Sequence, residues 1–179
     1  GKTMVCRMVE KELPVELTSV FLPRTVDSFD DMVAIVAQEV NVQTESGDQS
    51  NETGALIEKI VKQLKEQGQR LVIIFDEAEK IFLATLERIR KLIDQVNVDA
   101  IYFQILLSGR NQLKENLSQL SIVSFAEAEE RRFELEPLEE QTVGLYVNYC
   151  IKVAAGESNE FFYADIVEKI AAGSGGNFR

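Results

Sequence analysis

The sequence contains no histidine and only two cysteines among its 179 residues. The absence of histidine excludes Ser-His-Asp and Cys-His catalysis, and it excludes zinc and haem sites that need an imidazole ligand. Two cysteines cannot form a four-cysteine metal site, and the sequence has no CxxC pair that would suggest redox activity. Cys6 and Cys150 both lie among apolar residues at helical spacing, so we expect buried free thiols in a reducing compartment.

Long apolar runs and positive charge are also scarce. No uninterrupted apolar stretch approaches the roughly 20 residues that a membrane-spanning helix needs, and the sequence does not open with a signal peptide. We therefore expect a cytoplasmic protein with no membrane segment in this chain. The 19 basic and 30 acidic residues give a net charge of −11, which argues against a general binder of the nucleic-acid backbone.

Apolar periodicity predicts strands that alternate with helices and are followed by helices alone. Strands are expected at Leu17–Leu22, Leu71–Phe75 and Ile101–Leu107, with a further candidate at Arg132–Leu135. Helices are expected at Met4–Leu13, Phe29–Val40, Leu56–Leu64, Leu86–Val96, Asn111–Leu120, Glu139–Ala155 and Phe161–Ala172. This order indicates an α/β fold with a parallel sheet and a small helical appendage.

Capping and loop residues mark the ends of several of these elements. Asp27 or Ser28 is placed to cap the helix that begins at Phe29. Residues 43–54 are polar and lack periodicity, which predicts a flexible loop. Gly173 is placed to end the last helix.

The segment LVIIFDE (71–77) is a buried strand that carries Asp76 and Glu77 at its carboxyl end, where open α/β sheets bind ligands. An aspartate there can hold Mg²⁺, and a neighbouring glutamate can polarise the water that attacks a γ-phosphate. Alternatively, Asp76 caps the following helix and Glu77 is a solvated first-turn carboxylate. The opening triplet GKT matches only the last three residues of the phosphate-binding pattern G-x-x-x-x-G-K-[ST], and by itself it favours a chance match. Together with Asp76 and Glu77 about 70 residues later, it favours nucleotide chemistry.

Two further residues are candidates for contacts with phosphate. Ser108 follows a predicted strand and places a hydroxyl where a γ-phosphate would lie, although a serine at a strand end also commonly forms a turn. Arg179 follows a glycine-rich break, so its guanidinium can bind phosphate from the helical appendage. The alternative for Arg179 is a fraying C-terminus.

Together these motifs resemble the AAA-type P-loop ATPases, and specifically the subgroup that contains the general secretion pathway component A ATPases and the transposition-associated ATPases. The resemblance covers nearly the whole chain. It is carried by GKTMVCR (1–7), FLPR (21–24), LVIIFDEAEKI (71–81), LERIRKL (86–92), QILLSGRNQL (104–113), FELEPLEEQTVGLYV (133–147) and GSGGNFR (173–179).

The resemblance implies an α/β, parallel-sheet P-loop NTPase core over residues 1–136 and the start of a small helical lid over residues 137–179. It also implies that the first strand and most of the P-loop are missing from this chain. The family commonly has an arginine that acts on a neighbour's nucleotide, but Ala128 and Glu129 stand at the expected place, with Arg131 and Arg132 nearby. The roles that the resemblance assigns are ATP binding by Gly1, Lys2, Thr3 and Arg179, Mg²⁺ ligation by Thr3 and Asp76, and catalysis by Glu77 and Ser108.

The function that the resemblance implies is ATP binding with slow, Mg²⁺-dependent hydrolysis in secretion or pilus assembly. ATP and ADP are then the ligands, and the partners are further copies of this chain or secretion and pilus-assembly proteins. One alternative is a nucleotide-gated, DNA-associated adaptor of the transposition or replication type, which the charge of −11 disfavours. Another is a degenerate P-loop module that mediates interactions without turnover.

Overall fold

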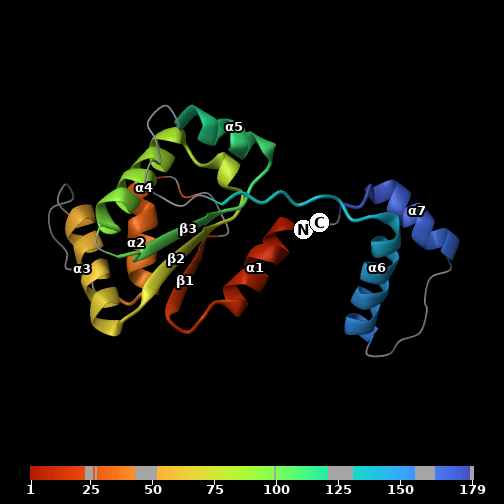
Figure 1. Ribbon diagram of the computed structural model, residues 1–179, viewed down its shortest axis with the longest axis horizontal. Helices are drawn as coiled ribbons and strands as arrows, with labels where there is room; N and C mark the ends of the chain where they lie inside the picture. Colours follow the sequence, from red (N-terminus) through yellow and green to blue (C-terminus); the bar gives the residue numbers. More distant parts are fainter. Residues whose placement is uncertain are drawn as a thin grey trace. The chain divides into compact units, whose positions relative to one another are not determined.

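The computed structural model describes residues 1–22, 26, 28–42, 52–98, 100–120, 131–155 and 164–177 (Figure 1). The chain divides into two compact units, one formed by Lys2–Arg131 and the other by Arg132–Arg179 together with Gly1. The functional division at residue 136 stays a prediction.

The first unit is a parallel sheet with helices on both of its faces. Its elements are α1 (Lys2–Glu12), β1 (Leu17–Leu22), α2 (Phe29–Glu39), α3 (Glu52–Gln67), β2 (Arg70–Phe75), the 3₁₀ helix η1 (Ala78–Lys80), α4 (Leu83–Val96), β3 (Phe103–Leu107) and α5 (Asn111–Leu120). The strand order is β1-β2-β3, and both pairs are parallel. The predicted α/β class with a parallel sheet is therefore confirmed.

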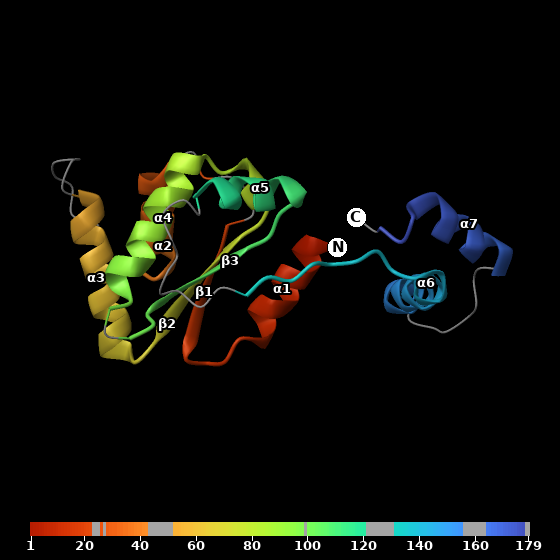
Figure 2. The same cartoon turned by 45° about the horizontal axis from the view of Figure 1, so that its top comes forward.

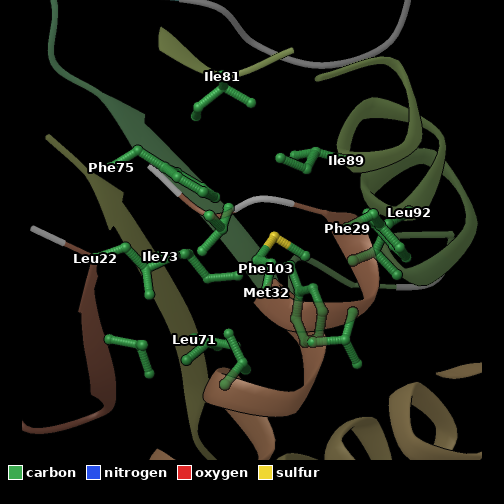
Figure 3. Close-up of a cluster of buried hydrophobic side chains, with 14 of the residues drawn as sticks. Leu22, Phe29, Met32, Leu71, Ile73, Phe75, Ile81, Ile89, Leu92 and Phe103 are labelled. Carbon is green, nitrogen blue, oxygen red and sulfur yellow. The ribbon is translucent and has the colours of Figure 1, made fainter. Parts of the chain in front are cut away.

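The central strand β2 is apolar on both faces, and its side chains alternate between two cores. Leu71, Ile73 and Phe75 pack into the larger core, which α2, α3, α4 and α5 complete (Figure 3). Val72 and Ile74 face the other way and pack against Cys6 of α1. Helix α1 thus covers the face of the sheet opposite to α2, α3 and α4, as Figures 1 and 2 both show.

Helix α2 begins where the sequence predicts. The Ser28 hydroxyl is the N-cap and accepts a hydrogen bond from the Asp31 backbone N–H at 3.1 Å. Asp27, the other predicted cap, lies outside the described residues. The predicted apolar face of α2 is buried at Phe29, Met32, Val33, Val36 and Val40.

Helix α3 begins at Glu52, so the predicted loop 43–54 is wrong for its last three residues. The Thr53 hydroxyl donates a 2.7 Å hydrogen bond to Asp30 of α2. This polar contact holds the first turn of α3, which precedes the apolar residues from which the helix was predicted. Residues 43–51 of the predicted loop lie outside the described residues.

Asp30 connects three helices through its carboxylate. The Arg88 guanidinium of α4 donates two hydrogen bonds to it, each 2.9 Å long, and Thr53 of α3 donates a third. The bonds from Arg88, and then the bond from Thr53, lower the pKa of Asp30 below its ordinary value. Because the folded-state pKa is depressed, this contact stabilises the fold above the unfolded pKa, near 4. The stabilisation is lost as the pH falls through the folded-state value.

We expect Asp30→Asn to lower the free energy of unfolding by about 0.5 kcal/mol at pH 7, because the ion pair is about half exposed and screened by solvent. The difference from the parent should shrink as the pH is lowered below about 4. Urea unfolding at neutral and acidic pH measures both effects. Asp94→Asn, an exposed carboxylate on the same α4 helix as Arg88, is the control and should cost no stability at pH 7. A deficit for Asp30→Asn that is independent of pH would contradict the assignment.

The second unit contains α6 (Glu140–Ala155) and α7 (Ala164–Ser174). The two helices pack around Val143, which is fully buried, and Ala171. The predicted burial of Cys150 is wrong, because its thiol is exposed on α6, whereas Cys6 is buried as expected. Across the described part of both units, no helix is long and apolar enough to cross a membrane.

Two further predictions for the second unit are wrong. Residues Arg132–Leu135 form no strand, and the side chains of Phe133 and Leu135 are 88% and 55% exposed. Gly173 does not end α7, which continues to Ser174 before Gly175 and Gly176 take left-handed φ values of 55° and 74°. A Cβ atom at Gly176 would collide with the carbonyl oxygen of Leu138. The glycine is therefore needed for the 3.0 Å hydrogen bond from the Leu138 N–H to the Gly176 carbonyl.

Candidate functional site

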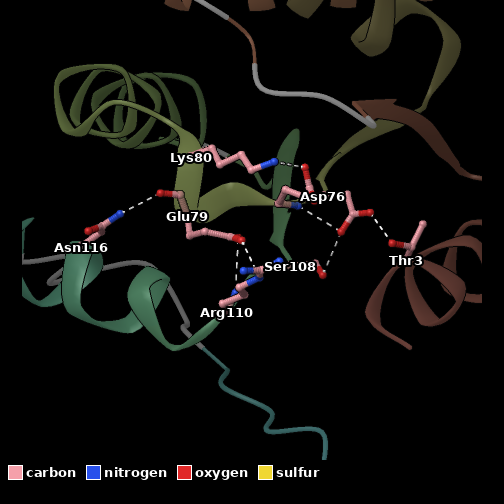
Figure 4. A network of polar contacts seen from close by, with 8 residues as sticks. Thr3, Asp76, Glu79, Lys80, Ser108, Arg110 and Asn116 are labelled. Atoms are coloured by element: carbon pink, nitrogen blue, oxygen red, sulfur yellow. Dashed lines mark hydrogen bonds and ion pairs between the residues drawn. The ribbon is translucent and has the colours of Figure 1, made fainter. Parts of the chain in front are cut away.

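Three oxygen-bearing side chains meet at the carboxyl-terminal edge of the sheet. The Thr3 hydroxyl donates a 2.6 Å hydrogen bond to Oδ2 of Asp76, and the Ser108 hydroxyl donates a 3.3 Å bond to Oδ1 (Figure 4). They come from the first turn of α1 and from the ends of β2 and β3. Residues 73 positions apart in the sequence are thus brought into direct contact.

The strand register explains why two of these side chains meet. Phe75 of β2 pairs with Leu107 of β3, so Asp76 and Ser108 are the next residues at the same edge. The Ser108 N–H continues the ladder by donating to the Phe75 carbonyl at 2.9 Å. This edge is where parallel sheets bind their ligands, and α1 begins there and places Thr3 over it.

Asp76 is 7% exposed, and its carboxylate accepts three hydrogen bonds. The third comes from the Glu77 backbone N–H to Oδ1 at 3.0 Å. The N-cap of η1 is Glu77 and that of α4 is Phe82, neither with a side-chain capping bond, so the alternative prediction that Asp76 caps the following helix is wrong. The other two bonds come from Thr3 and Ser108, which are distant in the sequence, and the short one from Thr3 is typical of a charge-assisted hydrogen bond from a hydroxyl to a carboxylate.

Glu77 is oriented differently from Asp76. Its backbone is left-handed, with φ of 53°, and its carboxylate is 47% exposed and forms an ion pair with Lys80. An exposed pair of this kind is worth about 0–1 kcal/mol. The Glu77 carboxylate can therefore leave Lys80 for another partner at little cost.

Cys6 lies next to the site from the side of α1. Burial raises the pKa of its thiol, the hydrogen bond with Ser108 lowers it, and the negative charge of Asp76 raises it again, with a net rise. The thiol is therefore neutral at pH 7 and belongs to the packing of the site rather than to its reactive groups.

The other predicted site residues differ in how far the structure describes them. Lys2 is exposed in the first turn of α1, beside Thr3, and Gly1 directly precedes that helix. Arg179 lies outside the described residues. Arg131 and Arg132 are exposed, and both take part in interactions. The roles assigned to all of these residues stay predictions.

The oxygen ligands of Thr3 and Asp76 fit Mg²⁺, a hard cation that is commonly held by one or two carboxylates, phosphate oxygens and water. The described residues contain no group of three or more histidine, cysteine or acidic side chains that could hold a metal ion. A cation held by Thr3 and Asp76 therefore needs phosphate oxygens and water to complete its coordination. The chemistry of these ligands matches a metal that arrives with a nucleotide.

A second set of contacts beside the site was not predicted. Glu79 contacts Arg110, and the Asn116 side chain donates a 3.1 Å hydrogen bond to the Glu79 carbonyl (Figure 4). Two sequence signals are associated with these contacts. They are the third acidic residue in DEAE (76–79) and the glycine that directly follows Ser108.

Residues 1–117 match the AAA domain family. The chain belongs to this family. The AAA chain is also 26% identical over 154 residues to the General secretion pathway protein A of Aeromonas hydrophila. That match covers 86% of the chain but only 28% of the length of the relative. These findings support a nucleotide-binding AAA ATPase.

Two solved structures have the same fold as this AAA chain. Cdc6p from Pyrobaculum aerophilum superposes with a TM-score of 0.66 at 18% identity, over 96% of this chain and 45% of that one. The ADP form of the ORC2 protein of Aeropyrum pernix gives a TM-score of 0.59 at 10% identity, over 85% of this chain and 40% of that one. At such identities the likeness shows the fold alone.

Proposed function

We propose that this AAA chain binds ATP with Mg²⁺ and hydrolyses it. The observation that carries the proposal is the contact of Thr3, Asp76 and Ser108 at the sheet edge where α1 begins. A helix N-terminus favours phosphate because its free N–H groups and its dipole attract negative charge. The first turn of α1 contains no acidic residue that would oppose an anion.

The proposed roles follow from the chemistry of each side chain. The Lys2 ammonium binds the β- and γ-phosphate oxygens, with Gly1 before it and Arg179 as a further phosphate contact. Thr3 and Asp76 hold Mg²⁺, which when bound offsets the charge of the phosphate oxygens. Ser108 donates a hydrogen bond toward the γ-phosphate.

Glu77 is the proposed general base. Its carboxylate orients the attacking water and accepts its proton, while the γ-phosphoryl group leaves the bridging oxygen of ADP. The half-exposed position of Glu77 supports this role, because water reaches the carboxylate directly. The nearly buried Asp76 is instead suited to a fixed ligand.

The proposed setting is secretion or pilus assembly in the cytoplasm, supported by the similarity to a general secretion pathway protein. The proposed partners are further copies of the chain or proteins of that machinery. The net charge of −11 gives no support to a role on nucleic acid.

The proposal is tested by ATP titration calorimetry on the full-length protein with and without Mg²⁺. We expect Asp76→Ala to weaken Mg²⁺-dependent binding by roughly tenfold or more, because even outer ligands of a metal contribute this much. Thr3→Val, which keeps the shape of Thr3 but removes the hydroxyl, should weaken the same Mg²⁺-dependent part.

If Asp76 only holds the local backbone through the Glu77 N–H, its loss costs roughly 1 kcal/mol of stability and leaves the Mg²⁺ dependence intact. Melting temperatures of the same variants measure that cost. ATP binding without any hydrolysis by the parent would favour the interaction module over the ATPase.

A further inference from the structure

The Glu79 side chain joins the segment after β2 to the turn after β3. It is only 10% exposed, and its Oε2 accepts a 3.3 Å hydrogen bond from the Arg110 backbone N–H. The Arg110 guanidinium adds an ion pair in which Nε lies 3.6 Å from Oε1. A carboxylate this far removed from water, with a backbone amide as its partner, is suited to fixing the backbone of that turn.

Gly109 leaves the space that this contact requires. A Cβ atom at this position would lie 2.8 Å from Oε2 of Glu79 and 2.9 Å from Cδ2 of Leu113. Any side chain would therefore displace the Glu79 carboxylate. The contact between Glu79 and Arg110 therefore depends on the absence of a side chain at Gly109.

Backbone bonds hold the same turn from its other side. The Ala78 N–H donates to the Ser108 carbonyl at 2.8 Å, and the Ser108 N–H donates to the Phe75 carbonyl at 2.9 Å. The Ser108 hydroxyl makes a long, 3.3 Å bond to Asp76 and a hydrogen bond with the Cys6 thiol. Both are weak contacts, so the backbone bonds on either side of Ser108 also set the position of its hydroxyl.

We propose that Glu79 is a positioning residue that holds the Ser108 hydroxyl toward the γ-phosphate by fixing the backbone at Arg110. The role rests on the proposed ATPase function. Residues 76–79 therefore include the proposed metal ligand Asp76, the proposed base Glu77 and the proposed positioning residue Glu79. Figure 4 shows Asp76 and Glu79 with their contacts.

A purely structural role makes a different prediction. If Glu79 only stabilises the start of α5, its loss lowers the melting temperature. It then also slows hydrolysis by the same factor whichever residue occupies position 108. If Glu79 acts through Ser108, removing Glu79 matters only while the Ser108 hydroxyl is present.

The test is a double-mutant cycle in the full-length protein, with single-turnover hydrolysis rates, ATP dissociation constants and melting temperatures for each variant. We expect Glu79→Ala to slow hydrolysis by roughly ten- to hundredfold, the scale of a small misplacement, while ATP affinity changes by less than about threefold. In a Ser108→Ala background, Glu79→Ala should have no further effect on the rate.

Two more variants isolate the contact itself. Glu79→Gln keeps an oxygen for the Arg110 N–H and should restore most of the rate. Gly109→Ala should slow hydrolysis about as much as Glu79→Ala. A glutamine variant as slow as the alanine variant, or additive losses in the cycle, would overturn the positioning role.

The two proposals fail in different ways. Parental hydrolysis that Glu79→Ala leaves unchanged would overturn this role alone. A parent protein that neither binds nor hydrolyses ATP would overturn the proposed function and this role with it.

Discussion

Replacing Glu77 by glutamine is expected to leave ATP binding intact and to slow hydrolysis by roughly 100-fold or more, the usual scale for loss of a general base. Glutamine keeps the shape of the side chain but cannot accept the proton of the attacking water. Binding should survive because the proposed ligands for phosphate and Mg²⁺ are other residues. Single-turnover rates and ATP dissociation constants for parent and variant measure the two effects separately.

Lys80→Ala is the matched control for this prediction, because it removes the ion-pair partner of Glu77 and leaves the carboxylate in place. It should keep the hydrolysis rate within a few-fold of the parent. A Glu77→Gln protein that hydrolyses ATP at the parental rate would refute the assignment of the base.

The second large effect is expected at Lys2, where alanine should abolish measurable ATP binding. The ammonium is a compact charge that no neutral side chain replaces at the β- and γ-phosphate oxygens. Lys2 lies in the first turn of α1 beside Thr3, where the helix dipole also favours an anion. Calorimetric titration with ATP and Mg²⁺ gives the affinity directly.

Lys11→Ala tests whether charge alone matters, because Lys11 lies in the last turn of the same helix. It changes the net charge by the same amount and should leave the affinity unchanged. Undiminished ATP affinity in the Lys2→Ala protein would exclude the proposed phosphate site at the start of α1.

The meeting of Asp76 and Ser108 was predictable because it depends on strand pattern. The short apolar segments Leu71–Phe75 and Ile101–Leu107 favour strands covered by helices, and parallel strands bring their carboxyl ends to one edge. Each polar residue that follows such a strand is then placed at that edge. The contact between Thr3 and Asp76 shows that α1 begins at this same carboxyl-terminal edge of the sheet.

The contacts of Glu79 were not predictable in the same way. They depend on the 3₁₀ turn of η1 and on side-chain directions, which apolar periodicity does not encode. The expected strand at Arg132–Leu135 failed for a related reason. A short segment is a strand only where another strand pairs with it, and local pattern does not reveal the partner.

The left-handed backbone of Glu77 has a consequence for the evolution of this site. A side chain other than glycine or asparagine in that conformation costs roughly 1–2 kcal/mol, so glycine at position 77 would give a more stable fold. Selection for stability alone would therefore remove the carboxylate that the proposed chemistry needs. At position 77, thermal stability and the proposed activity favour different residues. Stabilising substitutions in this chain are therefore best sought at other positions.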